Sequence, residues 1–247
     1  MKRTLIRLMG WPAIALPRDP TVFDRWLWLR SYLLQGPYRT LDAGCGAGEF
    51  TLYAAKVGNH AIGLSFDVHL NNIARARADL LRISNAEFIT ADLRALDRLT
   101  DELGTFDQII CFETIEHIMN DRKVITDLSQ LLNSGGQLLL TAPFKNHRRL
   151  PGEKVSESED GGHVRWGYTH EEIRSIFQSA GLRVQAETYI SGYLSQQNLR
   201  LTYRLGNTRS AGAILFPLRF LQPLDHLMTR LLNYPYLSIA VIGIRNG

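Results

Sequence analysis

The stretch "LDAGCGAGEF", residues 41–50, decides the fold, because three glycines within five positions directly follow a short apolar run. The apolar run predicts a buried strand, and Glu49 marks the place where a helix begins. Between them, Gly44, Gly46 and Gly48 can adopt positive φ and let a ligand lie against bare backbone. The segment therefore predicts a strand, a tight turn and a helix, an arrangement that binds nucleotide-type ligands at a sheet edge.

The spacing of these glycines differs from the dinucleotide fingerprint. A GxGxxG pattern counted from Gly44 would end at position 49, where the sequence has Glu49. A carboxylate at the helix N-terminus would repel a pyrophosphate, whereas a cofactor with a cationic centre and no phosphate would avoid that repulsion. The loop therefore favours S-adenosylmethionine. A strand-to-helix turn that holds no ligand is the simpler alternative.

Length and composition indicate one α/β core with a modest extra segment. The chain has 247 residues, of which 45% are apolar and 21% charged. Its 28 basic and 24 acidic residues leave a net charge of +4, too small to indicate a nucleic-acid binder. Cys45 and Cys111 form no spaced pair, which favours free thiols in a reducing compartment. The N-terminal stretch does not read as a secretory signal, and no apolar run approaches the roughly 18 residues of a membrane span, so we expect a cytoplasmic protein.

Strands and helices alternate from about residue 38 to residue 190. We expect strands at 38–43, 60–65, 86–91, 106–112, 136–142 and 182–189. We expect helices at 48–57, 68–83, 121–133 and 169–180, preceded by one over 21–34. Short apolar strands separated by amphipathic helices predict an α/β fold, a doubly wound sheet with parallel inner strands.

Acidic residues follow the third and fourth predicted strands. Asp92 comes directly after the third, and Glu113, Glu116 and His117 come after the fourth. The carboxyl ends of parallel strands meet at the edge where open α/β sheets bind ligands, so a carboxylate there can accept from an adenine amino group. If residues 113–117 are helical, the two glutamates and the histidine lie on one face.

With these residues in view, the chain resembles the class I S-adenosylmethionine-dependent methyltransferases, in the broad group called methyltransferase type 11 or 12. The resemblance runs from Tyr38 to Tyr189 through the motifs LDAGCGAG, AIGLSFD, ITADL, FDQIICFETIEHI, GGQLLLTAP and GYTHEEIRSIFQSAGLRV. It implies a Rossmann-like, seven-stranded methyltransferase sheet with helices on both faces, and S-adenosyl-L-methionine as the cofactor. The motifs as a set specify the cofactor and say almost nothing about the acceptor.

The resemblance also implies which residues contact the cofactor. They are Asp42, Gly44, Cys45, Gly46 and Gly48 at the methionine end, Ser65 and Phe66 at the ribose, Asp92 and Leu93 at the adenine, and Phe112 in the pocket wall. One position departs from the family, which usually has an acidic residue where this chain has Ser65. A serine offers one hydroxyl in place of two acceptor oxygens. Asp67 either reaches the ribose or caps the next helix, and the cap is favoured.

The resemblance divides the chain into four parts. These are an N-terminal helical segment (1–37), the cofactor-binding core (38–191), a helical insertion (192–235) and the final strand (236–247). The insertion carries Arg200, Arg204, Arg209, Arg219 and Arg230 against a single acid, Asp225. An apolar face flanked by arginines suits a membrane surface or a cover over a lipid-like acceptor. A helical subdomain that packs on the sheet or on a second copy is the alternative.

Methyl transfer is an in-line displacement at a sulfonium-bound carbon, and a hydroxyl acceptor must also lose its proton. The candidate catalytic residues are His163, His117 and Glu113, with His147 as a further candidate base. With Glu116 they resemble the Glu, Glu, His, His metal site of methyltransferases that act on the ribose of small-RNA ends, and more loosely the metal-dependent O-methyltransferases of ubiquinone synthesis. An acidic residue and a histidine at this place also shape the pocket floor of family members without metal, so we assign no metal ligand.

Residues 144–168 form a polar connection too long for a simple link, and we expect an active-site lid with His163, Trp166 and Tyr168 on its inner face. Thr169 and Glu172 then predict a capping box. The sequence as a whole predicts methyl transfer to a small, hydrophobic or lipid-like acceptor, above all O-methylation. The alternatives are a metal-assisted RNA-end ribose methyltransferase and a non-catalytic cofactor-binding domain. A nucleic-acid partner is disfavoured because no basic groove is visible.

Overall fold

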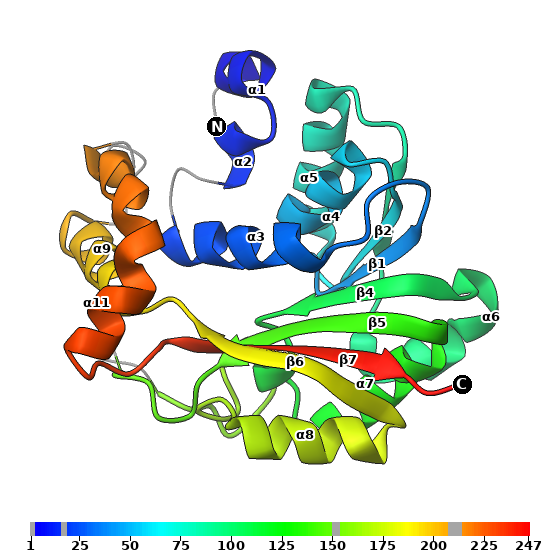
Figure 1. Ribbon diagram of the computed structural model, residues 1–247. Coiled ribbons are helices and arrows are strands. Elements are labelled where there is room, and N and C mark those ends of the chain that lie inside the picture. Colours follow the sequence, from blue (N-terminus) through cyan, green and yellow to red (C-terminus); the bar gives the residue numbers. More distant parts are fainter. Residues whose placement is uncertain (1–2, 16–18, 150–153, 207–213) are drawn as a thin grey trace.

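The computed structural model describes residues 3–15, 19–149, 154–206 and 214–247 (Figure 1). Arg209, a member of the predicted arginine set, lies outside these ranges, and so do the side chains of Phe216 and Arg219. The strands are β1 (Arg39–Ala43), β2 (His60–Ser65), β3 (Ala86–Thr90), β4 (Phe106–Phe112), β5 (Leu132–Pro143), β6 (Leu182–Ile190) and β7 (Ser238–Arg245).

The strands form one seven-stranded sheet in the order β3-β2-β1-β4-β5-β7-β6. The pairs from β3 to β5 are parallel, and β7 is antiparallel to both of its neighbours. The strand order reverses between β1 and β4, and the carboxyl ends of such strands leave room for a ligand at that point. The predicted α/β class and seven-stranded sheet are confirmed.

Helices cover both faces of the sheet (Figure 1). They are α1 (Arg3–Met9), α2 (Pro12–Ala15), α3 (Pro20–Tyr32), α4 (Glu49–Lys56), α5 (Val68–Leu81), α6 (Thr100–Leu103), α7 (Asp121–Gln130), α8 (His170–Ser179), α9 (Tyr193–Arg204) and α11 (Asp225–Leu231). Three 3₁₀ helices join them: η1 (Leu93–Arg98), η2 (Ile115–His117) and η3 (Phe216–Leu224). None of the helices in the described ranges combines the length and apolar character that crossing a bilayer requires.

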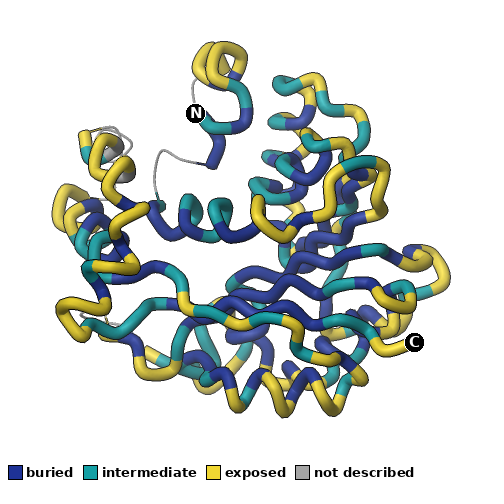
Figure 2. Tube along the Cα trace, in the orientation of Figure 1, coloured by how far each residue is buried: buried dark blue, intermediate teal, exposed yellow. Residues whose placement is uncertain are grey.

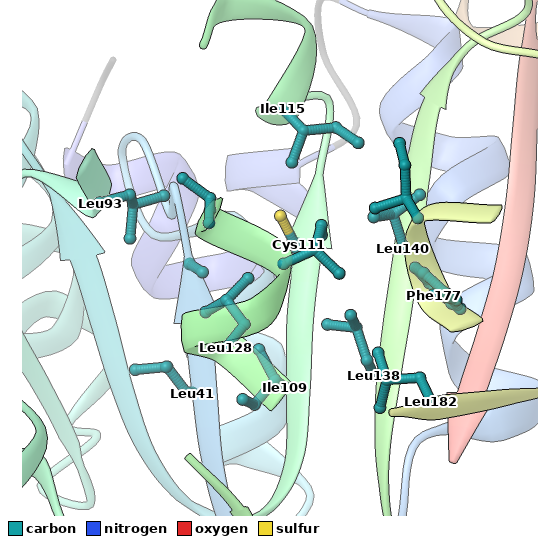
Figure 3. Close-up of a cluster of buried hydrophobic side chains, with 14 of the residues drawn as sticks. Leu41, Leu93, Ile109, Cys111, Ile115, Leu128, Leu138, Leu140, Phe177 and Leu182 are labelled. Atoms are coloured by element: carbon teal, nitrogen blue, oxygen red, sulfur yellow. The ribbon is translucent and has the colours of Figure 1, made fainter. Parts of the chain in front are cut away.

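The hydrophobic core lies between the central strands and these helices. On one face, side chains of β1, β4 and β5 pack against α7 and α8; Figure 3 shows Leu41, Ile109, Leu128 and Phe177 in this cluster. On the other face, α3 and α4 cover the same strands. Figure 2 shows the central strands almost wholly buried. The sheet is therefore a rigid platform, and its strand ends are fixed in space.

Local signals begin two helices where the sequence predicts. The Asp67 carboxylate accepts from the backbone N–H groups of His69 and Leu70, so Asp67 is the N-cap of α5. Thr169 and Glu172 form the predicted capping box of α8. The main difference is that β5 begins at Leu132, four residues before the predicted start.

The insertion sits beyond the carboxyl edge of the sheet, because β6 ends there and α9 follows it directly (Figure 1). It contacts α3 through buried polar groups. The Gln222 amide donates to the Asp24 carboxylate on α3 and to Ser195 Oγ on α9 at 3.0 Å. Burial raises the pKa of Asp24 to about 7. A titratable carboxyl thus lies where the insertion meets the core.

This carboxyl makes the stability of the fold depend on pH. The folded-state pKa of Asp24 is above its unfolded value, so the unfolded chain loses this proton first and the free energy of unfolding falls as pH rises from about 4 to about 7. One such group contributes at most about 1.4 kcal/mol per pH unit. We expect Asp24→Asn to remove this contribution and flatten the pH dependence measured by denaturant unfolding. Asp101→Asn, which changes an exposed carboxyl, is the control, and equal slopes for wild type and Asp24→Asn would contradict the prediction.

Candidate cofactor and acceptor site

The three glycines of the turn are required for two different reasons. All three have positive φ, at 85° for Gly44, 53° for Gly46 and 80° for Gly48. A Cβ at Gly44 would lie 2.3 Å from Thr114 Oγ1, and one at Gly48 would lie 2.8 Å from a Phe88 ring carbon. A Cβ at Gly46 would meet nothing within 4 Å. Two glycines therefore serve packing within the protein, while Gly46 leaves its bare backbone facing open space.

Backbone hydrogen bonds hold this turn at the end of β2. The N–H groups of Gly44 and Cys45 both donate to the Leu64 carbonyl, at 3.0 and 2.8 Å. Beneath the turn, Asp42 is buried and accepts from Thr51 Oγ1 at 2.6 Å. Burial raises the pKa of Asp42 to about 7. Asp42 therefore ties the end of β1 to α4 from below.

A cavity of about 440 Å³ opens beside the turn, within the range of roughly 300–1,000 Å³ that is typical of small-molecule sites. Its walls come from the carboxyl ends of β1 to β4 and from the polar connection after β5. The predicted site residues among its lining are Gly44, Gly46, Ser65, Phe66, Asp92, Leu93, Glu113 and His117. The topology thus brings predicted residues from four strand ends to one hollow.

Four predicted cofactor residues lie outside this lining, namely Asp42, Cys45, Gly48 and Phe112. The Cys45 thiol is buried 3.8 Å from the Asn71 side-chain oxygen, and burial raises its pKa. The Phe112 ring packs edge-on against Phe50 at 4.9 Å, within the core cluster under α3 and α4. The prediction that Phe112 walls the pocket is corrected, because alternation along β4 turns its ring to the other face of the sheet.

Glu49 does not supply charge to the cavity, contrary to the expectation from the sequence. Its carboxylate pairs with Arg77 at 2.7 Å on α5 and is absent from the cavity lining. Repulsion of a pyrophosphate by Glu49 therefore does not explain ligand choice. The acidic groups that line the cavity are Asp92 and Glu113, together with Glu159 and Asp160.

The adenine end of the predicted site holds an ion-pair chain. Both oxygens of Asp92 accept from Arg94, at 2.8–2.9 Å from its Nε, and the hydrogen bonds with this guanidinium lower the pKa of Asp92. Arg94 also pairs with Glu159 at 2.7 Å. The Asp92 carboxylate is therefore engaged, and an adenine amino group would share it with Arg94.

At the end of β2, Ser65 lines the cavity while Asp67 caps α5. The Ser65 hydroxyl accepts from the Asp67 N–H at 3.2 Å and lies in the position where the family has an acid. Phe66 follows on the cavity wall with 74% of its surface exposed. An exposed ring beside an open cavity is suited to stacking on a planar base.

The segment after β4 is not the single helix that would align its acidic groups. Glu113 has φ 46° and precedes η2, which spans only Ile115–His117. The condition under which the two glutamates would share a helical face is therefore not met, although Glu116 and His117 both lie in η2. Glu113 instead lies 3.7 Å from Arg25 on α3, and one of its oxygens is buried without a hydrogen-bond partner among the described residues.

A carboxylate and two imidazoles meet at η2. Glu116 Oε1 lies 3.8 Å from His117 Nε2 and 4.0 Å from His163 Nε2, and the two rings are 4.7 Å apart. Glu116 is fully buried, and neither of its oxygens has a hydrogen-bond partner in the described part of the chain. Burial, with the charge of Glu113, raises its pKa well above the usual value. Ligand atoms of the three residues lie within 4.8 Å of one another, close enough to surround one metal ion.

The described part of the connection after β5, residues 154–168, packs over η2. The Val164 N–H donates to the Glu116 carbonyl at 2.9 Å, and His117 Nδ1 lies 3.0 Å from the Gly162 carbonyl. Tyr168 is buried, with its hydroxyl 2.7 Å from Asp121 Oδ2. His147, the further candidate base, is buried with Nδ1 2.6 Å from the Phe144 carbonyl and does not line the cavity.

Several lining residues were not predicted from the sequence. They are Leu64, Leu70, Ala91, Arg94, Thr114, Ile118, Glu159, Asp160 and Gly161. Arg94, two residues beyond Asp92, could have been found as a charge partner. The lid residues 159–161 could not, because only the closed path of the connection brings them to the cavity.

Comparisons with known proteins agree with this geometry. A family model described as a methyltransferase domain matches residues 19–187, more than half of the chain. The chain belongs to this family, and its fold is that of the class I S-adenosylmethionine-dependent methyltransferases. S-adenosylmethionine is accordingly the cofactor of this protein.

The individual proteins that are similar to this chain share only a small part of its sequence. A ubiquinone biosynthesis O-methyltransferase of Colwellia psychrerythraea is 32% identical over 107 residues, 43% of this chain and 42% of that protein. The chain thus spans under half the length of this curated relative. Coclaurine N-methyltransferase bound to N-methylheliamine and SAH has a TM-score of 0.60 at 17% identity, covering 90% of this chain and 71% of its own. The cyclase SpnF has a TM-score of 0.61 at 17% identity, covering 90% and 79%. These two structures establish similarity of fold alone.

A substitution at Gly46 tests whether the turn binds the cofactor. We expect Gly46→Val to abolish binding of S-adenosylmethionine in calorimetric titration, because its side chain would occupy the open space beside the turn. Gly135→Val is a matched control, since Gly135 also has positive φ (76°) with nothing within 4 Å of its Cβ but lies far from the cavity in β5. Both variants carry similar backbone strain. Unchanged cofactor affinity in Gly46→Val would refute the assignment of the turn.

Proposed function

We propose that this protein transfers the methyl group of S-adenosylmethionine to an oxygen of a small, hydrophobic acceptor. The observation that supports this most directly is a single cavity in which the bare Gly46 backbone and the side chains of Glu113 and His117 face the same space. The Gly46 backbone can accommodate the cofactor. The Glu113 and His117 side chains can serve an acceptor hydroxyl that must lose its proton. The cited O-methyltransferase relative is consistent with this chemistry.

In the proposed complex the cofactor runs along the strand ends. Its methionine part lies against Gly44 and Gly46, its ribose near Ser65, and its adenine between Phe66 and Leu93. This order follows the lining of the cavity from β1 to β3. The sulfonium then faces Glu113, whose negative charge favours a cationic centre. The acceptor approaches from the side of β4 and the lid.

His117 and His163 are the proposed bases, each within about 4 Å of Glu116. A hydroxyl acceptor attacks the methyl carbon as its proton passes to an imidazole, the carbon–sulfur bond breaks, and S-adenosylhomocysteine leaves as a neutral sulfide. The buried Glu116 is then poised to stabilise the imidazolium. Glu113, held near Arg25, would orient the acceptor.

A metal-assisted version of this reaction is the second candidate. The buried Glu116 oxygens, without partners among the described residues, together with the two histidines form a donor set that fits a divalent ion. Such an ion would polarise the acceptor oxygen and lower its pKa.

RNA-end methylation has less support, since the chain carries a net charge of only +4. A non-catalytic cofactor-binding domain would bind S-adenosylmethionine and release no S-adenosylhomocysteine.

The proposal places the acceptor between the cavity and the insertion, which begins at the carboxyl edge of the sheet. It also includes contact between the insertion and a membrane surface from the cytoplasmic side. Incubation of the protein with S-adenosylmethionine and a panel of phenolic, lipid and sugar acceptors tests the activity. We expect S-adenosylhomocysteine to accumulate with hydrophobic hydroxyl compounds. Tight cofactor binding without any release across the panel would favour the non-catalytic alternative.

The histidines give a separate prediction. Replacing His117 or His163 by alanine should lower turnover by about 10²-fold or more while cofactor affinity changes little, because general-base assistance is lost. His69→Ala, an exposed histidine on α5, is the control. Addition of a chelator separates the two versions of the mechanism: lost turnover restored by Mg²⁺ or Mn²⁺ supports the metal, and unchanged turnover excludes it. Full activity in both His117→Ala and His163→Ala would contradict any role for this pair.

A further inference from the structure

The insertion has its polar and apolar sides reversed relative to an ordinary surface helix. Among the side chains of η3 and α11 that the structure describes, the buried ones are Gln222, Asp225 and Thr229, at 5%, 6% and 1% exposure. On the outer side, Leu227 and Leu231 are 56% and 71% exposed. Surface helices normally turn their apolar stripe toward the core. Here the apolar stripe faces outward.

The neighbouring helix α9 repeats this reversal. Its buried residues include Ser195, Asn198 and Thr202, while Leu201 and Leu205 are 39% and 50% exposed. The described helices α9, η3 and α11 thus bury polar side chains against one another and against α3. Leu218, Leu221, Leu224 and Leu232 extend the exposed set. An apolar surface of this extent on one part of a protein marks an interaction site.

Hydrogen bonds fix the helices in this orientation. The two Asp225 oxygens accept from the N–H groups of Gly192 and Leu194, at 2.8 and 2.6 Å, and so cap the N-terminus of α9. Thr229 Oγ1 accepts from the Tyr193 N–H at 2.7 Å. Rotating η3 and α11 to bury their leucines would break these bonds and leave the α9 N-terminus uncapped. The outward leucines are therefore a consequence of the capping.

Charge indicates which partner covers this face. The described arginines of α9 and α11 are Arg204 and Arg230, both exposed, and Arg200, which is half-buried. Asp225 is the single acid of the insertion, and it is buried in the capping bonds. A second copy related by a two-fold axis would bring like charges together across the interface. An anionic lipid surface complements both the leucines and the arginines.

Resting on the proposed function, we infer that the outer face of η3, α11 and α9 docks on an anionic bilayer, so that an acceptor dissolved in the membrane meets the carboxyl edge of the sheet. The leucines enter the interface between headgroups and acyl chains. The arginines contact the lipid phosphates. The insertion begins directly after β6 at that edge, so the docking face and the cavity belong to the same end of the molecule.

The test is co-sedimentation of the full chain with phosphatidylcholine vesicles, with and without phosphatidylglycerol. We expect sedimentation with the anionic vesicles that weakens as salt increases. Leu227→Asp with Leu231→Asp should lower the vesicle partition coefficient about tenfold or more, because two anchoring side chains are lost and charge is added. Lys56→Glu is the matched control, since it changes the net charge by the same −2 at an exposed position on α4. It should sediment like wild type.

Three outcomes would overturn the inference: no sedimentation of wild type with anionic vesicles, equal sedimentation with neutral vesicles, or unchanged sedimentation of the double variant. A wild-type dimer that the double variant dissociates would assign the face to a second copy instead. Calorimetric titration with S-adenosylmethionine, run in parallel without lipid, keeps the two proposals separate. If the wild-type protein does not bind S-adenosylmethionine, the proposed function is refuted. If it binds S-adenosylmethionine but not the vesicles, only the docking is refuted.

Discussion

The close approach of the glycine turn to the strand ends beside it is the constraint on which the rest of the site depends. The Leu64 carbonyl accepts two consecutive N–H groups of the turn, which fixes the end of β1 against the end of β2. That approach is feasible only because Gly44 has no Cβ to meet Thr114 and Gly48 none to meet Phe88. The backbone between them is held open at Gly46. A cavity at this place follows from packing inside the protein, before any ligand is considered.

Polar groups left unpartnered by the fold then define the chemistry. The strained Glu113 and the buried Glu116 each have an oxygen for which the described residues offer no donor. Buried carboxyl oxygens in this state are costly, and in native proteins they usually mark a ligand, an ion or a catalytic role. Arg25 reaches Glu113 from α3, and His117 and His163 reach Glu116 from η2 and the lid. Elements remote in sequence thus supply the two sides of the proposed acceptor site.

Much of the fold could be predicted from the sequence, because the alternation of apolar strands with amphipathic helices is strong and the glycine turn is distinctive. Asp67 as a helix cap and the Thr169–Glu172 capping box also follow from local rules. Other predictions were wrong or were not made because they depend on contacts between residues distant in the sequence. Glu49 turned to Arg77 because the two lie side by side only in the folded chain. The reversed faces of the insertion depend on Asp225 capping α9, whose N-cap residue Gly192 lies 33 residues earlier in the chain, and no local pattern reveals this.

A crystal structure of the protein with S-adenosylhomocysteine tests the central claim most directly. The account predicts the adenosine between Phe66 and Leu93, the homocysteine against the Gly44–Gly46 backbone, and the sulfur facing the space between Glu113 and His117. Density for the ligand at any other place, or an empty cavity at a saturating ligand concentration confirmed by calorimetry, would contradict it.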